Sequence, residues 1–165
     1  MKIIMTAGRG EGNTTLSAFD AALKEAGILN YNIIRLTSVI PPGTEVVEEK
    51  WPNGPAEHGK KLYTVLSDIR TDLLGRAIAA GIGWYQDKDG RGIFAEHTDI
   101  IESLNEKEAE RNVRQKIQAT IEDLCKHRGY KFEQKKLKMV VLSTEVTNKP
   151  TCTLVAAVYQ AEPFK

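Results

Sequence analysis

The chain has 165 residues, a net charge of +1, and ordinary shares of hydrophobic (41%) and charged (27%) residues. This length fits a single domain, and the composition excludes a disordered chain, while the balanced charge gives no overall signature for binding nucleic acid or acidic membranes. No apolar run is long enough to span a membrane, and the first residues lack a signal-peptide core, so we expect a cytoplasmic protein.

The N-terminal segment predicts a strand, a glycine loop and a helix. Residues 3–7 are apolar and predict a short strand, whereas GRGEGN at 8–13 is predicted to be a loop because three glycines in five residues disfavour regular structure. Thr14 or Thr15 can cap the helix that follows, and Gly27 ends it. Apolar side chains at helical spacing predict its inner face: Leu16, Phe19, Leu23 and Ala26.

The middle of the chain predicts strands. Residues 31–40 read as one strand that ends at Pro41 and Pro42, because proline cannot donate to a ladder. Residues 48–60 form an irregular connection. Apolar or alternating runs predict three further strands at 61–69, 77–86 and 92–98, with a hairpin turn at 87–90 between the last two.

The last third predicts one long helix and two strands. SLNE at 103–106 has the spacing of a capping box, and Gly129 ends the helix. Its predicted inner stripe is Val113, Ile117, Ile121 and Leu124. Strands at 136–146 and 152–160 follow. Two helices with about seven strands predict an α+β layered fold in one domain.

Two common kinds of site are not supported by the residues. The glycines at 8–12 are followed by Asn13 where a dinucleotide fingerprint needs glycine, and no P-loop lysine follows. The three histidines are scattered, so we predict no metal site: His58, His97 and His127. Cys125 and Cys152 lack metal-ligand spacing and are predicted to be buried or free thiols in a reducing compartment.

Three polar residues have both an ordinary and a functional interpretation. Asp20 lies four residues before Lys24, which is typical of an exposed ion pair on a helix. Glu96 ends an apolar run, where it is either a solvated strand end or a carboxylate in apolar surroundings, suited to donating a proton. Asn32 lies just inside a strand, where asparagine usually makes local hydrogen bonds.

The adjacent pair Thr37-Ser38 also allows two interpretations. Hydroxyl residues are common where a strand borders a turn, which is the ordinary explanation. A serine hydroxyl can alternatively attack the preceding carbonyl, so that an N-to-O acyl shift replaces the amide by an ester. Elimination from the ester leaves dehydroalanine, and its hydrolysis gives a pyruvoyl group at a new chain start. The chain would then make its own carbonyl cofactor from Ser38.

Five segments, in this order, resemble the pyruvoyl-dependent arginine decarboxylases of archaea and some bacteria. The segments are AFDAALKEAGI, the asparagine of NIIRL, TSVIPP, the glutamate of GIFAEH, and the helix KEAERNVRQ. The resemblance covers most of the chain. It implies a four-layer αββα sandwich of largely antiparallel sheets, as in pyruvoyl-dependent histidine and arginine decarboxylases, and decarboxylation of L-arginine to agmatine and carbon dioxide.

The resemblance also implies a processed chain. Cleavage between Thr37 and Ser38 would give a β chain of residues 1–37 and an α chain of residues 38–165, with the pyruvoyl group formed from Ser38. Asn32 matches the asparagine implicated in this cleavage, where it would stabilise the oxyanion. Several members have Ser-Ser at this point, but only the second residue supplies the nucleophile.

The remaining roles concern the substrate. Glu96 matches the proton donor, and Asp20 matches the carboxylate that binds the substrate guanidinium. His97 stands where some members have an aromatic residue, which leaves the pH optimum open. The resemblance implies a trimer, or a multiple of it, with active sites between subunits. Two alternatives remain: the same chemistry on another amino acid, or an unprocessed homologue that acts as a binding subunit. Agmatine could serve polyamine synthesis or acid consumption.

Overall fold

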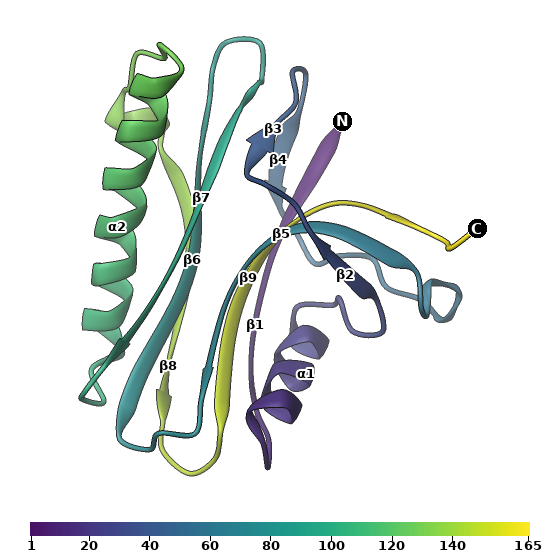
Figure 1. The fold of residues 1–165 in the computed structure, drawn as a ribbon, viewed down its shortest axis with the longest axis vertical. Helices are drawn as coiled ribbons and strands as arrows, with labels where there is room; N and C mark the ends of the chain where they lie inside the picture. The colour runs from purple at the N-terminus through teal and green to yellow at the C-terminus, as the bar shows by residue number, and fades with distance from the viewer.

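The computed structural model describes all 165 residues and has an α+β architecture with two helices and two β-sheets (Figure 1). The helices are α1 (Thr15–Glu25) and α2 (Glu106–His127). The strands are β1 (Lys2–Glu11), β2 (Asn32–Arg35), β3 (Val39–Ile40), β4 (Glu45–Glu48), β5 (Lys61–Thr71), β6 (Arg76–Gln86), β7 (Gly92–Ile101), β8 (Lys138–Val146) and β9 (Thr151–Glu162). Two short 3-10 turns, Pro55–Glu57 and Gln134–Lys136, lie in connections.

The first sheet has five strands in the order β2-β5-β9-β1-β4 and is mixed. Its long central strands β5, β9 and β1 are antiparallel, whereas the short edge strands β2 and β4 run parallel to β5 and β1. Helix α1 covers one face of this sheet. Its buried residues are mostly small, with Ala18, Ala22 and Ala26 packed against Leu154 and Leu66. The small side chains let the helix lie close to the strands.

The second sheet has four strands in the order β3-β7-β6-β8, and all its pairs are antiparallel. Helix α2 covers its outer face, and every fourth residue of the helix from Ala109 to Cys125 is buried there. The predicted stripe residues Val113, Ile117 and Ile121 are confirmed as fully buried. Gly81 and Gly83 lie under this stripe, where an added Cβ would meet Val113 and Ile117.

The two sheets pack face to face, so that the elements form layers in the order α1, first sheet, second sheet, α2 (Figure 1). A third apolar cluster fills the space between the sheets and includes Ile82, Trp84, Phe94 and Val155. The turns after β5 and β8 carry the chain from one sheet to the other, and only β6 and β7 form the predicted hairpin. Neither helix is long and apolar enough to cross a membrane.

The prediction of a glycine loop at 8–13 was wrong over most of its length. Strand β1 continues to Glu11, and Gly8 and Gly10 pair with β9 opposite Leu154 and Cys152. An added Cβ at Gly8 would lie 2.2 Å from the Ala22 carbonyl oxygen of α1. The glycines therefore allow a helix to approach the strand closely, which is a known role of glycine within a sheet.

The two helix starts also differ in part from the predictions. Thr14 is confirmed as the N-cap of α1, and its side chain accepts a hydrogen bond from the Ser17 amide. Leu16 was expected on the inner face but is 69% exposed, because the helix turns its alanines to the sheet. The capping box predicted at 103–106 is absent. Asn105 is the N-cap of α2 and accepts a hydrogen bond from the Glu108 amide.

The single strand predicted at 31–40 is two strands in different sheets. Strand β2 pairs with β5 in the first sheet, and β3 pairs with β7 in the second. This split, together with the unpredicted strand β4, gives nine strands rather than about seven. The residues between β2 and β3 are Leu36, Thr37 and Ser38, so the hydroxyl pair lies where the chain crosses between the sheets.

Candidate functional site

The candidate site forms where the chain leaves one sheet and enters the other. The Leu36 amide still donates to the Thr64 carbonyl of β5, at 3.0 Å, and so belongs to the first sheet. The Ser38 carbonyl accepts a hydrogen bond from the Phe94 amide of β7, at 2.8 Å, and so belongs to the second. The bond between Thr37 and Ser38 therefore connects segments that are anchored to different layers.

A tight turn surrounds this bond. The Val39 amide donates to the Thr37 carbonyl at 2.9 Å, which closes a three-residue γ-turn with Ser38 at its centre. Only Asn30 among the non-glycine residues has a positive φ, so the turn at Ser38 is of the common inverse type. The Thr37 carbonyl oxygen thus accepts a hydrogen bond from the Val39 amide. The same amide would stabilise the negative charge that forms on this oxygen if the carbonyl were attacked.

The Ser38 side chain points to β7. Its hydroxyl donates a hydrogen bond to the Glu96 carboxylate, with 2.7 Å between Ser38 Oγ and Glu96 Oε2. A carboxylate in this position can accept the proton of a hydroxyl that becomes a nucleophile. In the sequence, only the family resemblance relates Ser38 to Glu96, whereas in the structure their side chains are in direct contact.

Ser38 and Glu96 open into a cavity of about 380 Å³ between β3, β7 and the C-terminal half of α2. The cavity is lined by Thr37, Ser38, Val39, Ile93, Phe94, Ala95, Glu96, His97, Thr120, Leu124 and Arg128. A second, more polar hollow of about 320 Å³ contains Arg35 and Asp68 and shares Glu96 and His97 with the first. The Glu96 carboxylate therefore lies at a wall common to two open spaces.

His97 follows the carboxylate and faces α2. Its Nε2 lies 2.7 Å from the Thr120 hydroxyl. Burial lowers the pKa of His97, the Lys116 charge lowers it further, and the Glu96 charge opposes them. The imidazole is therefore favoured in its neutral form beside the candidate site.

Tyr159 reaches the turn from the other sheet. Its hydroxyl donates to the Val39 carbonyl at 2.7 Å, and its ring packs edge-on against Phe94 with 6.3 Å between the ring centres. Burial, followed by the charge of Glu96, raises the pKa of Tyr159 to about 12, so the hydroxyl stays protonated near neutral pH. The sequence did not predict a role for Tyr159, because a tyrosine near the end of the apolar run CTLVAAVYQ carries no local functional signal.

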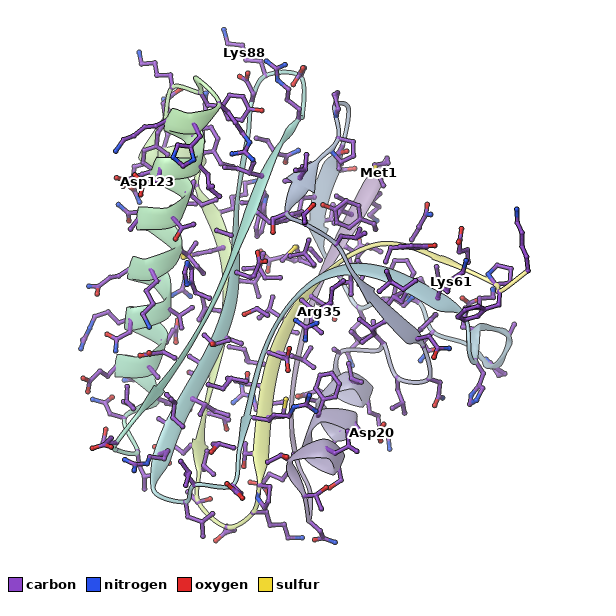
Figure 2. The ribbon with its side chains drawn as sticks, viewed as in Figure 1. Met1, Asp20, Arg35, Lys61, Lys88 and Asp123 are labelled. Carbon is purple, nitrogen blue, oxygen red and sulfur yellow. The ribbon has the colours of Figure 1, made fainter.

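Two predicted site residues lie away from this cavity. Asp20 is exposed on α1, on the opposite side of the sandwich from α2, and lines neither hollow (Figure 2). The ion pair expected between Asp20 and Lys24 is not formed. The Asn32 side chain donates to the Gly59 carbonyl at 2.7 Å and lines neither hollow. Within one chain, only Thr37, Ser38 and Glu96 come together.

The other side chains considered for chemistry lie apart. No three His, Cys, Asp or Glu side chains gather where they could hold a metal ion. Cys125 and Cys152 are buried and free, as predicted. Burial raises the pKa of the Cys152 thiol to about 12, which disfavours the reactive thiolate.

Comparison with known proteins gives one consistent result. A family model described as "Pyruvoyl-dependent arginine decarboxylase (PvlArgDC)" matches residues 2–163. A protein of that name from Pyrococcus abyssi is 36% identical over 159 residues, which cover 95% of this chain and 93% of the relative. The protein of that name from Thermococcus sibiricus is 35% identical over the same coverage. The one from Methanocaldococcus jannaschii is 37% identical over 117 residues, or 68% of this chain and 66% of the relative.

Proposed function

Because the chain belongs to the pyruvoyl-dependent arginine decarboxylase family, we propose that it converts L-arginine to agmatine and carbon dioxide after cleaving itself between Thr37 and Ser38. The cofactor of this family is a covalently bound pyruvoyl group, and here Ser38 is its source. The observation that carries the proposal is the hydrogen bond from the Ser38 hydroxyl to Glu96, at a peptide bond that joins two sheets.

The first step of cleavage uses groups that are already in contact. The Ser38 Oγ attacks the Thr37 carbonyl carbon, and its proton passes to Glu96. The new C–O bond forms first and gives a tetrahedral intermediate; the C–N bond then breaks, and the released amine of residue 38 takes up a proton. The Val39 amide, 2.9 Å from the Thr37 oxygen, stabilises the oxyanion of the tetrahedral intermediate.

The next step separates the chains. Loss of the Cα proton of residue 38 and breakage of its Cβ–O bond leave Thr37 with a free carboxylate and residue 38 as dehydroalanine. Water then replaces the nitrogen of residue 38, which leaves as ammonia. The Phe94 amide donates a hydrogen bond to the Ser38 carbonyl. This bond favours loss of the Cα proton, because it stabilises the negative charge that spreads onto the carbonyl oxygen. The products are residues 1–37 and residues 38–165.

The residues present suit a pyruvoyl group at position 38. The cavity beside Ser38 is open, so a substrate amine can reach this position, and the Phe94 amide holds the carbonyl oxygen of residue 38. The group supplies an electron sink for the electrons that remain when the substrate carboxylate leaves as carbon dioxide. Glu96 holds the proton that is then given to the substrate carbon. Ile93, Phe94 and Leu124 give the cavity apolar walls, from which a bound substrate would displace water.

Recognition of the substrate guanidinium is assigned to Asp20 of a neighbouring subunit. Asp20 is exposed on α1 and cannot line the cavity of its own chain as the structure stands, so a trimer or a multiple of it would have to supply it. A guanidinium and a carboxylate form a strong bidentate pair. The layered sheets and helices agree with the four-layer αββα fold of pyruvoyl-dependent histidine and arginine decarboxylases, and the free cysteines agree with a cytoplasmic enzyme.

The direct test is turnover by the purified protein. Incubation with carboxyl-labelled L-arginine should release labelled carbon dioxide and an equal amount of agmatine, without added pyridoxal phosphate. Treatment with cyanoborohydride should abolish activity only in the presence of arginine, because this reagent reduces the C=N bond between substrate and protein in preference to the free ketone. A cleaved protein that turns over another amino acid, but not arginine, would contradict the assigned substrate.

A further inference from the structure

The strand β3, which follows the proposed cleavage point, is the shortest in the molecule and lies at the edge of its sheet. Its two residues pair with β7, with Val39 opposite Ile93. The Ser38 carbonyl accepts a hydrogen bond from the Phe94 amide of β7, and the alternation of an antiparallel ladder makes the neighbouring Val39 a non-hydrogen-bonded position. Both backbone groups of Val39 therefore point away from β7, toward the open edge.

These two outward groups have specific partners. The Val39 amide donates to the Thr37 carbonyl, and the Val39 carbonyl accepts the hydroxyl of Tyr159 at 2.7 Å. The tyrosine comes from β9 in the other sheet, and it provides the one side-chain hydrogen bond to this edge of Val39. Its ring is held in place by edge-on contact with Phe94, whose own amide binds the Ser38 carbonyl.

These contacts form a continuous chain from Tyr159 to the carbonyl that is attacked. The Tyr159 hydroxyl fixes the Val39 carbonyl, and the Val39 amide fixes the Thr37 oxygen. Without the hydroxyl, the Val39 carbonyl would be free to turn toward solvent, and the amide on the other side of the same residue would lose its fixed direction. An oxyanion donor is effective only when it is already oriented before the charge develops.

We propose that Tyr159 is a positioning residue for self-cleavage: its hydroxyl orients Val39 so that the Val39 amide acts as an oxyanion donor to the Thr37 carbonyl. The inference rests on the proposed self-cleavage and extends it to a residue that lies 120 positions after Val39 in the sequence. Tyr159 does not touch the reacting atoms, and its effect is transmitted through the backbone of Val39.

The chain offers a closely matched control. Tyr85 also donates its hydroxyl to a backbone carbonyl, that of Lys131, at the same distance of 2.7 Å. It lies in the core between α2 and its sheet, and it does not line the cavity. Tyr159→Phe and Tyr85→Phe therefore each remove one tyrosine–carbonyl hydrogen bond, but only the first affects the turn. A similar loss in melting temperature is expected for both variants.

The first experiment follows cleavage by intact mass under denaturing conditions, starting from freshly translated protein. Tyr159→Phe should cleave roughly three- to ten-fold more slowly than wild type, as expected from loss of one oriented hydrogen bond, while Tyr85→Phe keeps the wild-type rate. Hydroxylamine cleaves the ester directly and so bypasses the later elimination. The slower cleavage of Tyr159→Phe should therefore persist in its presence, because the acyl shift is the step that is slowed. Equal cleavage rates for Tyr159→Phe and wild type would overturn the inference.

The second experiment does not depend on cleavage. In a Ser38→Ala background, which lacks the nucleophile, hydrogen exchange at the Val39 amide should accelerate roughly ten-fold on adding Tyr159→Phe and stay unchanged on adding Tyr85→Phe. Unchanged exchange in both cases would show that Tyr159 does not order this amide and would overturn the inference alone. A wild-type chain that never cleaves would instead overturn the proposed function, and the role of Tyr159 with it.

Discussion

Ser38 and Glu96 lie 58 residues apart in the sequence, but the Ser38 hydroxyl donates a hydrogen bond to the Glu96 carboxylate at 2.7 Å. Ser38 directly precedes β3, and Glu96 lies on β7, which pairs with β3. The contact forms because Ser38 is the first residue after β2 whose backbone accepts a hydrogen bond from β7. One carboxylate could therefore serve both proposed roles, accepting the proton of Ser38 during cleavage and holding a proton for the substrate afterwards.

Replacement of Glu96 by glutamine tests both of these roles. Glu96→Gln keeps the size of the side chain but removes the group that takes up the Ser38 proton. We expect slower cleavage, and a kcat about 100-fold lower in the fraction that does cleave, since a positioned acid or base contributes at least this much. Intact mass and agmatine release measure the two effects. Glu145→Gln, at an exposed position on β8, should match wild type in both.

Asp20 is expected to act on binding rather than on chemistry. Asp20→Asn should raise the KM for arginine about ten-fold, because it removes the negative charge that is proposed to pair with the substrate guanidinium. The rate of self-cleavage should not change, because Asp20 does not contact the cleavage site. Asp123→Asn, on the exposed side of α2, is the matched control (Figure 2). A KM equal to that of wild type would remove Asp20 from the substrate site.

Gly8 tests why β1 contains glycines. Gly8→Ala would place a methyl group 2.2 Å from the Ala22 carbonyl oxygen, so helix α1 would have to shift. We expect a loss of about 1–3 kcal/mol in the free energy of unfolding, as for other overpacked cores. Gly54→Ala meets no atom within 4 Å and should change the stability little. Urea unfolding of the two variants compares them directly, and equal stability would contradict the close approach of α1.

The lowered pKa of His97 is expected to make the stability of the folded protein depend on pH. Burial and the Lys116 charge lower its pKa in the folded state below the ordinary value of 6.5, so the unfolded chain binds a proton more readily. Its contribution to stability is therefore complete above about pH 6.5 and is lost as the pH falls toward the lower folded value.

Melting temperatures at pH 7.5 and pH 5 check this effect. His97→Gln, which can still bond to Thr120, should lose less stability than wild type between the two pH values. His58→Gln, in a surface loop, should behave as wild type does. A parallel decline in wild type and His97→Gln would show that other groups cause the acid sensitivity.

The sequence predicted the elements better than their connections. The stripe of Val113, Ile117 and Ile121 has a period of one helical turn, and that local signal was sufficient for α2. By contrast, NIIRLTSVI has no local feature that separates β2 from β3, because the break arises from pairing with β5 on one side and β7 on the other. Strand pairing with distant segments is not encoded in a short window.

The same limit applies to the site. Ser38 and Glu96 were identified by resemblance to a family, and their contact is a product of the sheet register. Tyr159 could not be found, because its partner, the Val39 carbonyl, is a backbone group that every residue has. The loop predicted at 8–13 was wrong for a related reason. The glycines of β1 allow the close approach of α1, and this contact is seen only in three dimensions.

We propose that Ser38 becomes a pyruvoyl group by cleavage of the bond before it. Intact mass of the aged wild-type protein under denaturing conditions tests it most directly, with Thr37→Ser as a variant that should also cleave and Ser38→Ala as one that should not. Two chains are expected: residues 1–37 with a free carboxylate, and residues 38–165 lighter by one ammonia than a chain that starts with serine. A single chain of 165 residues in the wild-type sample would contradict it.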